Sequence, residues 1–437
     1  MHSPPRLSLV AAALAGVGLL TAFGVTHAQQ EQSGASRSGD QASLEPGPSP
    51  DKLEEIVVFG RSLKLLGRAE AASEGTVGGA DLAVRPMLRV AELLEAVPGL
   101  VAVQHSGSGK ANQYFLRGFN LDHGTDFTTY VDGMPWNLRS HGHGQGYLDV
   151  NGLIPEVAER IDYRKGPYRA DLGDFSQAGA SFITTIDRLD APFVGFELGQ
   201  YGWDRVAAGG TRELANDALL TGVVEYKSYD GPWQRAEGLA HTALFGKYER
   251  PTGFGKLSAT VWGYSGDWHP TEQVPERAIG TSVCPDAFCA LDPTAGGNTS
   301  RWIGSVVLDG NKWRASAYVQ YYDWFMQSNP TYDFQINQFD RRTTLGGRYA
   351  RTLIESDKLQ LDVGGEFRYD DIGNVGVDHY DQGRFVANIS QNSIQEPSVA
   401  GYVEATWSPT AKLRLMGGAR ADYYDFISAP NRLCRMW

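Results

Sequence analysis

The sequence predicts a small mixed α/β domain followed by an antiparallel transmembrane β-barrel, and three observations support this fold class. After Asp190 the chain consists of segments in which apolar and polar residues alternate, separated by turns. The chain has 52 Gly, 20 Tyr, 18 Phe and 10 Trp, although its mean hydropathy is only -0.32. Residues 79–186 instead contain short apolar segments with both helical and strand spacing, as a compact domain would.

The composition narrows the classes of function. The chain of 437 residues is long enough for more than one domain, and it lacks the several long apolar runs of a helical membrane protein. The net charge of -12 and the absence of a Lys/Arg block argue against a nucleic-acid partner. Three cysteines are too few for a disulfide scaffold or a zinc ribbon, and they are Cys284, Cys289 and Cys434.

Residues 1–28 are typical of an export signal peptide. Arg6 precedes a largely apolar run, and Thr26 and Ala28 place small residues where a signal peptidase cleaves. A single membrane anchor is the alternative, because the run is close to spanning length. Residues 29–53 are rich in Gln, Ser, Gly and Pro and contain few apolar side chains, so we expect a flexible tether.

The compact domain is expected to centre on residues 112–133. Two runs of β-forming residues, 114–116 and 128–131, are each followed by a turn that contains glycine. This pattern predicts a β-hairpin-like unit.

Further short elements are expected around this unit. Apolar residues recur at three- and four-residue spacing before Pro98-Gly99, which predicts a helix with one buried face. Its apolar positions are Val90, Leu93, Leu94 and Val97. The other expected elements are strands over residues 100–103, 161–164 and 181–186 and a short helix over residues 154–159.

Four motifs occur in a characteristic order in this region. They are a helix ending in Pro98-Gly99, an aromatic strand with Arg117-Gly118, a turn at Val131-Asp132-Gly133, and Glu159-Arg160-Ile161 followed by Gly166-Pro167. In this order they resemble the plug domain of TonB-dependent outer-membrane receptors. The resemblance covers residues 54–190 by motif. It implies a plug domain over residues 61–190, followed by an outer-membrane β-barrel over residues 191–437.

Beside a plug domain, residues 54–60 resemble a TonB box. The resemblance implies that this extended segment adds as an edge strand to the periplasmic energy transducer TonB, with affinity from main-chain hydrogen bonds. A first structural strand of the plug is the alternative. The residues assigned to TonB binding are Glu54, Glu55, Ile56, Val57, Val58, Phe59 and Gly60.

A histidine- and glycine-rich loop, residues 140–147, departs from the general receptor pattern. Imidazoles two positions apart on an extended strand project to one side, so His141 and His143 are candidates for contact with a transition metal or a metal chelate. Gln145 and His123 are candidate ligand contacts as well. The alternative is a structural loop whose histidines hydrogen-bond to plug carbonyls or the barrel wall. No resident metal or cofactor is expected.

The C-terminal part contains about eleven alternating segments, each near the ~10 residues that a tilted strand needs to cross a bilayer. In residues 359–370 the odd positions carry residues suited to contact with lipid, and most even positions carry polar residues suited to contact with water. A soluble sandwich is the alternative, but short turns alternate with long loops such as residues 269–300. The long loops would be extracellular, and we expect Cys284 and Cys289 to form a disulfide in this one.

Eleven strands are about half of the roughly 22 that enclose a plug. An open half-barrel would leave two edges of unpaired backbone in lipid. After Tyr424 the alternation breaks, and the odd Cys434 follows without a new strand. The sequence therefore predicts an incomplete barrel, with the chain a fragment or a frameshifted product.

The resemblance implies a receptor that imports a scarce solute with energy from TonB. The implied partners are TonB, a small-molecule or metal-chelate ligand and outer-membrane lipid. A passive pore or a surface-binding module without energy coupling is the alternative. A third class, a transducer that signals to a periplasmic regulator, is disfavoured because the tether is too short for an extra domain. An enzyme is not expected, since no catalytic order of Ser, His and Asp and no nucleophile elbow accompanies the histidines.

Overall fold

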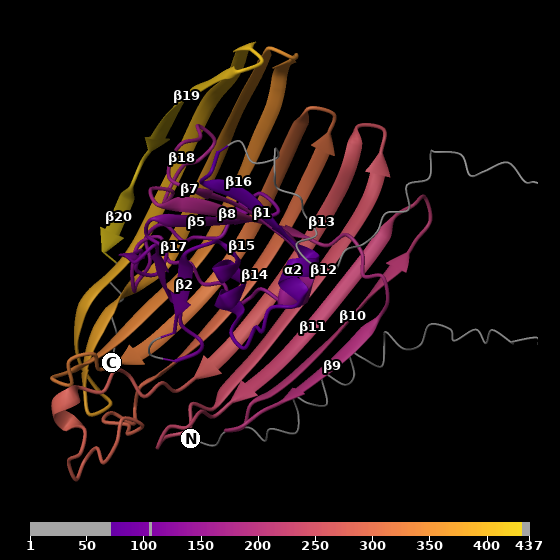
Figure 1. Ribbon diagram of the computed structural model, residues 1–437. Helices are drawn as coiled ribbons and strands as arrows, with labels where there is room; N and C mark the ends of the chain where they lie inside the picture. The colour runs from indigo at the N-terminus through magenta and orange to yellow at the C-terminus, as the bar shows by residue number, and fades with distance from the viewer. Residues whose placement is uncertain (1–70, 105–106, 431–437) are drawn as a thin grey trace, which may run out of the picture. The chain divides into compact units, whose positions relative to one another are not determined.

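The computed structural model describes residues 71–104 and 107–430, which belong to one compact unit spanning residues 63–437. The predicted signal peptide, tether and TonB box lie outside the described residues, as does Cys434. The described chain forms a plug domain and a long antiparallel sheet (Figure 1). None of the described helices has the length and apolar character needed to span a bilayer.

The plug domain contains two small sheets. One has the strand order β1-β7-β8-β5-β6, in which β5 and β8 are parallel and the other pairs antiparallel. Its strands are β1 (Glu74–Gly78), β5 (Phe127–Val131), β6 (Met134–Pro135), β7 (Ala158–Lys165) and β8 (Gly179–Thr185). The other sheet consists of β2 (Leu100–Val103), β3 (Gln113–Leu116) and β4 (Phe119–Asn120). The helices are α2 (Gly79–Ala83), η1 (Val90–Ala96) and η2 (Pro155–Val157).

The prediction of one hairpin over residues 112–133 is wrong. β3 and β5 are both strands, as expected, but they belong to different sheets. Arg117 and Gly118 have φ angles of 53° and 80°, so the chain reverses within two residues and β3 pairs with β4. β5 is buried along its whole length and pairs instead with β8, which is more than 40 residues later in the chain.

The two predicted helices are shorter and tighter than expected. The apolar spacing before Pro98 forms the 3-10 helix η1, which closes with hydrogen bonds to the third residue back, as from the Val97 amide to the Leu94 carbonyl (3.0 Å). The helix expected over residues 154–159 is reduced to three residues, because β7 already begins at Ala158.

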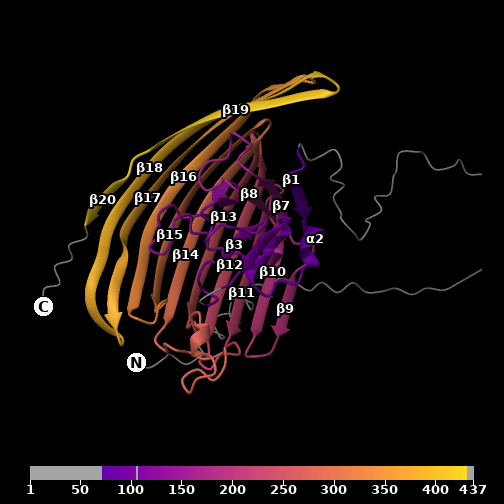
Figure 2. The ribbon, with the colours of Figure 1, turned by 60° about the vertical axis from the view of Figure 1, so that its left-hand side comes forward.

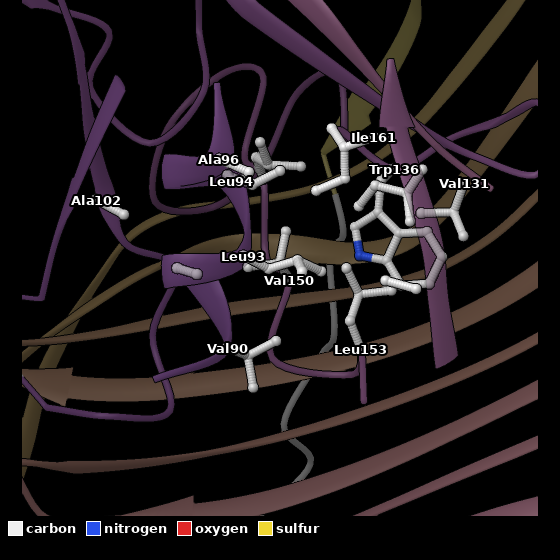
Figure 3. Packing of buried hydrophobic residues seen from close by; sticks show 14 of the residues in the cluster. Val90, Leu93, Leu94, Ala96, Ala102, Val131, Trp136, Val150, Leu153 and Ile161 are labelled. Atoms are coloured by element: carbon white, nitrogen blue, oxygen red, sulfur yellow. The ribbon is translucent and has the colours of Figure 1, made fainter. Parts of the chain in front are cut away.

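The expected core residues of this region are buried. Leu93 and Leu94 of η1 are 1% and 0% exposed and pack in one cluster with Trp136 and Ile161 (Figure 3). Full burial of each leucine is worth roughly 1.5–3 kcal/mol. The same cluster includes Phe245 and Trp262 of the long sheet, so the plug and the sheet share a core.

The long sheet follows the chain in order. Eleven strands, β9 to β19, each pair antiparallel with the next, and β20 pairs with β18. They are β9 (Phe193–Leu198), β10 (Asp204–Glu213), β11 (Leu219–Tyr229), β12 (Leu239–Thr252), β13 (Gly255–Trp268), β14 (Gly296–Gly310), β15 (Trp313–Ser328), β16 (Gln335–Glu355), β17 (Leu359–Asp381), β18 (Arg384–Thr410), β19 (Leu413–Tyr424) and β20 (Ile427–Pro430). The expected number of strands is confirmed, and β9 and β19 are the edges of the described sheet.

The predicted alternation of faces is confirmed as well. In β17, Phe367 is 49% exposed, whereas Arg368 and Asp370 are buried. In β13, Val261 is 50% exposed and Trp262 only 4%. Apolar side chains therefore cover the outer face, and the inner face carries polar groups. The sheet curves around the plug domain, which lies against this inner face (Figure 2).

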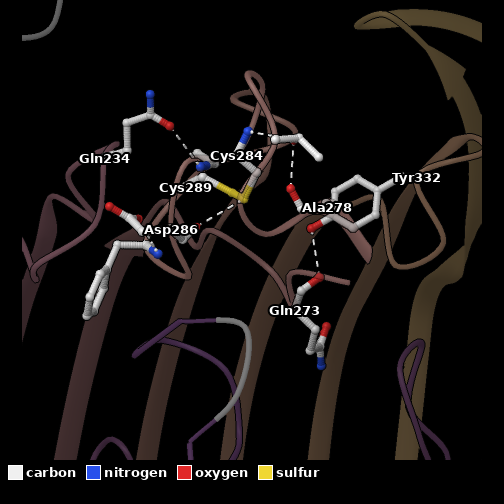
Figure 4. Close-up of a disulfide and its surroundings, with 10 residues drawn as sticks. Gln234, Gln273, Ala278, Cys284, Asp286, Cys289 and Tyr332 are labelled. Carbon is white, nitrogen blue, oxygen red and sulfur yellow. Dashed lines mark hydrogen bonds between the residues drawn. A yellow bond between two sulfur atoms is a disulfide. The ribbon is translucent and has the colours of Figure 1, made fainter. Parts of the chain in front are cut away.

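The long loop over residues 269–295 contains the expected cysteine pair. Cys284 and Cys289 are joined by a disulfide with a Cα–Cα distance of 5.2 Å, and both side chains are buried within the loop (Figure 4). The loop includes the 3-10 helix η3 (Glu276–Ala278). A hydrogen bond from the Tyr332 hydroxyl to the Gln273 carbonyl (2.9 Å) ties it to the turn between β15 and β16. The disulfide therefore closes a short turn within a loop that also contacts the connection between β15 and β16.

We predict that the purified, non-reduced protein has a mass lower by two hydrogens and a peptide in which Cys284 and Cys289 are linked. Replacement of both by Ser should leave the sheet intact, because the link closes only a short local loop, but should increase proteolysis within residues 269–295. Mass spectrometry after thiol alkylation without reductant measures the link. Alkylation of both cysteines would contradict it.

Candidate ligand-binding site

The histidine-rich segment, residues 140–147, forms a loop that we call the apical loop. It contacts the inner face of β15 and β16, where Trp324 and Asp340 are paired in register. Trp324 also pairs with Thr299, near the start of β14. The apical loop therefore lies toward the end of the sheet from which the long loop 269–295 emerges.

The apical loop is held to the barrel wall by buried polar groups. The side chains of Arg342 and Asp340 are both 0% exposed and form an ion pair of 2.6 Å. Arg342 also donates to the Ser140 carbonyl, and Asp340 accepts from the Gly142 amide at 3.1 Å. Gln338 donates to the Gly142 carbonyl at 2.8 Å. A Cβ atom at position 142 would lie 2.7 Å from a β16 carbonyl oxygen, so only glycine permits this close approach.

Three of the four predicted ligand residues lie together. The His141 ring stacks on Tyr147, with centroids 4.0 Å apart, and meets Trp324 edge-on at 4.8 Å. The rings of His123 and His143 are neighbours, with centroids 4.9 Å apart. His123 and His141 are buried, and His143 is half-buried. The structure thus groups His143 with His123, 20 residues earlier.

Gln145, the fourth predicted residue, is exposed on the apical loop. Its carbonyl oxygen accepts a hydrogen bond of 3.3 Å from the Thr125 hydroxyl. Two histidines of the cluster bond to the plug or the wall: His123 to plug carbonyls, and His143 to Gln338. These contacts agree with the alternative of a structural loop.

Several residues of the site were not identified in the sequence. Tyr147 ends the glycine-rich run, so its position in the sequence could have suggested it as a site residue. Tyr322 and Trp324 share the inner face of β15 with Gln320, and the period of two could have grouped them. No sequence signal shows that these strands, rather than others, face the apical loop. Lys110, only 5% exposed, lies in a Gly/Ser-rich segment that has no binding-motif spacing in the sequence.

The residues on both sides of the apical loop are held by arginines from the long sheet. Arg301 of β14 donates to the carbonyls of Asp149 (2.8 Å) and Trp136 (2.9 Å), and its guanidinium lies 4.3 Å from the Trp136 ring centroid. Arg368 of β17 donates to the Asn137 carbonyl at 2.9 Å. Backbone carbonyls of the plug thus accept hydrogen bonds from arginines of the long sheet.

The family model of the TonB-dependent receptor plug domain matches residues 68–180. Among solved structures, the chain resembles the ferric citrate transporter FecA in its unliganded form (TM-score 0.68, 13% identity), with coverage of 82% of this chain and 57% of FecA. The chain has the fold of a TonB-dependent receptor. It also resembles the ferric yersiniabactin uptake receptor FyuA from Yersinia pestis (TM-score 0.62, 15% identity, 82% and 60% coverage). The copper transporter OprC is similar too (TM-score 0.62, 15% identity, 82% and 55% coverage).

The chain therefore spans 55–60% of the length of these three TonB-dependent receptor structures. The TM-scores of 0.62–0.68 establish the shared fold, whereas identity of 13–15% carries no information about the solute.

Burial and nearby positive charge keep the imidazoles of His123 and His141 neutral. Burial, and then the charge of Lys110, lower the pKa of His123 from 6.5 to about 4. Burial, and then the charge of Arg342, hold the pKa of His141 well below its ordinary value. Burial lowers the pKa of Lys110 itself to about 8, although Glu272 and Asp122 oppose the shift. At neutral pH the imidazoles of His123 and His141 therefore carry one proton each and keep one nitrogen lone pair.

We predict that Arg342→Ala loosens the apical loop. The substitution leaves the Asp340 carboxylate buried without its guanidinium and removes a donor from the Ser140 carbonyl. Loss of one partner of such a pair costs about 3–5 kcal/mol. Hydrogen exchange of residues 136–147, measured by mass spectrometry on the purified chain, should become faster by at least about a hundredfold.

Arg341→Ala is the matched control. Arg341 directly precedes Arg342 on β16, its side chain is 60% exposed, and it pairs with Asp323 at 2.8 Å on the opposite face. An exposed pair of this kind contributes less than about 1 kcal/mol, so exchange should stay close to that of the parent. Equal protection of the apical loop in both variants would show that Arg342 does not hold it.

Proposed function

We propose that this chain serves energised uptake of a scarce solute across the outer membrane, and that a metal chelate is the solute class the site fits best. The observation that carries the proposal is the packing of the plug domain on the polar inner face of the barrel sheet. The plug and the sheet share an apolar core, and several wall arginines bond to plug carbonyls. A solute can pass such a plug only when part of the plug moves, and that movement needs work.

The position of β1 suits a pulling mechanism. β1 is the edge strand of the larger plug sheet and pairs only with β7 in that sheet. Arg169 links Glu74 of β1 (2.9 Å) to Glu404 of β18 (2.8 Å), and so attaches this strand to the wall. We propose that TonB binds residues 54–60 as an added edge strand and that tension on this segment reaches β1 first. An edge strand can separate from one neighbour without disruption of the rest of the sheet.

Two observations favour a metal chelate as the solute. The apex of the plug combines neutral imidazoles with the rings of Tyr147 and Trp324, and imidazole is a ligand for Zn, Cu, Fe and Ni. The similar structures FecA, FyuA and OprC are named as transporters or receptors for ferric citrate, ferric yersiniabactin and copper. The proposal extends this common property to the present receptor.

The experiment replaces Val57 by Pro in the receptor expressed in its native host. Proline removes a main-chain donor from the proposed TonB-binding strand, so uptake should be abolished while binding at the cell surface is retained. The measurement is accumulation of radiolabelled ferric and cupric chelates, with surface binding determined in de-energised cells. Uptake by the parent receptor should also stop when a protonophore is added.

Gln41→Pro is the control for the TonB-box substitution, because it places the same residue in the proposed tether, where no strand pairing is expected. It should leave uptake unchanged. Normal uptake by Val57→Pro would contradict TonB coupling through this segment. Uptake that continues in the presence of the protonophore would support the passive pore.

A further inference from the structure

A cavity of about 1050 Å³ lies between the plug and the first strands of the long sheet. Its lining comes from the plug, from β9 and β11, from the connections that follow these strands, and from the long loop over residues 269–295. Both connections lie at the same end of the sheet as the long loop, because β9, β11 and β13 all run toward that end. The apical loop contributes none of the described residues that line the cavity, so the two sites are separate.

The ammonium of Lys227, on β11, is the first feature of this cavity that indicates a ligand. Lys227 lines the cavity and is only 8% exposed. Within the described part of the chain its ammonium has no hydrogen bond or ion pair, and it contacts the face of Trp203 with 5.7 Å between Nζ and the ring centroid. An ammonium has three N–H donors, and burial without acceptors is costly. An occupant that offers acceptor oxygens would satisfy these donors.

The side-chain amide of Asn112 is the second such feature, and it lies on the plug side of the cavity. Asn112 is 6% exposed, and its amide forms no hydrogen bond to any other described residue. An amide both donates and accepts, whereas an ammonium only donates. The two sides of the cavity together suit groups that can accept from one neighbour and donate to another. Hydroxyl groups have this property.

Aromatic rings supply an apolar wall beside these polar groups. The rings of Trp203 and Tyr229 meet edge to face, with centroids 5.6 Å apart. Trp233 also lines the cavity and packs against Phe288 of the long loop at 5.9 Å. Trp203, Tyr229 and Trp233 are half-buried, so part of each ring is available to an occupant. The flat C–H face of a pyranose ring can pack on such a wall while its hydroxyls reach the polar groups.

The charges around Lys227 favour an uncharged occupant. Arg205 of β10 is bonded to three carboxylates, and they are those of Glu156 (2.7 Å), Glu197 (2.6 Å) and Glu225 (2.7 Å). A fourth carboxylate, that of Glu237, is 1% exposed and accepts from the Ser108 amide of the plug. The carboxylates outnumber the two cations, so they would repel an anion. A cation would instead meet the ammonium of Lys227. A neutral ligand avoids both penalties.

We propose that this cavity binds an uncharged, hydroxyl-rich ring, that is, a saccharide unit. The ring face packs on Trp203, and hydroxyls bond to the Lys227 ammonium and the Asn112 amide. This site goes beyond the proposed function, because it uses residues outside the apical loop and does not depend on TonB. A free saccharide and the headgroup of a neutral glycolipid share this chemistry.

The test uses the full chain, purified in lauryldimethylamine oxide so that the detergent carries no sugar. The probes are maltotriose, cellotriose and tri-N-acetylchitotriose, with dodecyl maltoside as a glycolipid-like probe. Titration calorimetry and tryptophan fluorescence should both detect binding of at least one of them. Binding of a trisaccharide indicates a free saccharide, whereas binding of the maltoside alone indicates a lipid-linked one. Citrate and choline, as an anion and a cation, should not displace the bound sugar.

Failure of all four sugar probes to bind would overturn the proposal, as would displacement of the sugar by citrate or choline. Val57→Pro and His143→Ala should bind the sugar as the parent does. Loss of TonB coupling, loss of the apical site and loss of this cavity therefore give different results.

Two substitutions locate the site. Lys227→Met keeps the length of the side chain and removes the ammonium, so sugar affinity should fall about 10- to 100-fold. The melting temperature of this variant should be equal to or above that of the parent, because a buried charge without a partner is removed. Trp203→Ala removes the ring on which the sugar packs and should weaken binding at least about tenfold.

Lys312→Met and Trp313→Ala are the matched controls at the opposite end of the sheet. The side chain of Lys312 is 48% exposed and pairs with Glu355 at 3.0 Å, and Trp313 stacks on Tyr349. Both controls should bind the sugar with the affinity of the parent. Equal affinity of Lys227→Met and the parent would show that the ammonium does not contact the ligand and would rule out the site.

A measurement on the parent chain covers the case in which the variants fail to fold. A saturating concentration of the sugar that binds should slow hydrogen exchange in residues 199–203 and 231–234, which adjoin the cavity. Exchange in residues 309–313, at the other end of the sheet, should not change. Peptide mass spectrometry measures both regions. Equal exchange in residues 199–203 and 231–234 with and without the sugar would contradict the site.

Discussion

The backbone carbonyls of plug residues 136–149 set the main constraint on this structure. These groups lie against the inner face of the long sheet, where most of the residues are buried, and a buried carbonyl without a donor costs about 1–3 kcal/mol. Arg301, Arg342 and Arg368 supply donors from β14, β16 and β17. Since the three side chains come from different strands, the plug segment can satisfy its carbonyls in only one position on the wall. The position of the apical loop, and of the histidines within it, follows from that docking.

Two of these arginines are neutralised within the wall itself. Asp340 and Arg342 are two residues apart on β16, as are Arg368 and Asp370 on β17, and residues two apart on a strand share a face. The plug carbonyls therefore meet donors whose charge is already balanced. If the segment leaves, water can replace its carbonyls, and no unpaired charge is left in the wall. Such an interface is specific in position, yet it costs less to open than one in which the plug supplies the counter-charge.

The sequence was informative where one periodicity or one local motif determines the structure. Alternation with a period of two predicted both the strands and their buried faces, and it needs no knowledge of distant residues. The expected hairpin failed because two left-handed residues, Arg117 and Gly118, close a tighter turn, and because β5 finds its partner in β8. The contact between the rings of His123 and His143 could not be predicted from the sequence either. It depends on contacts such as the hydrogen bond from the Leu148 amide to the His123 carbonyl (2.7 Å), which join separate segments.

The same contacts couple the neighbouring rings of His123 and His143 to the position of the plug. His123 is oriented by plug carbonyls, whereas His143 is oriented by Gln338 of the wall and lies in a loop held by Arg342 and Asp340. The separation of the two Nε2 atoms therefore depends on whether the apical loop is docked. In the proposed function, a solute that contacts both rings binds the docked state more tightly and, by reciprocity, stabilises it. Displacement of the loop from β16 would then separate the two rings and lower the affinity for that solute.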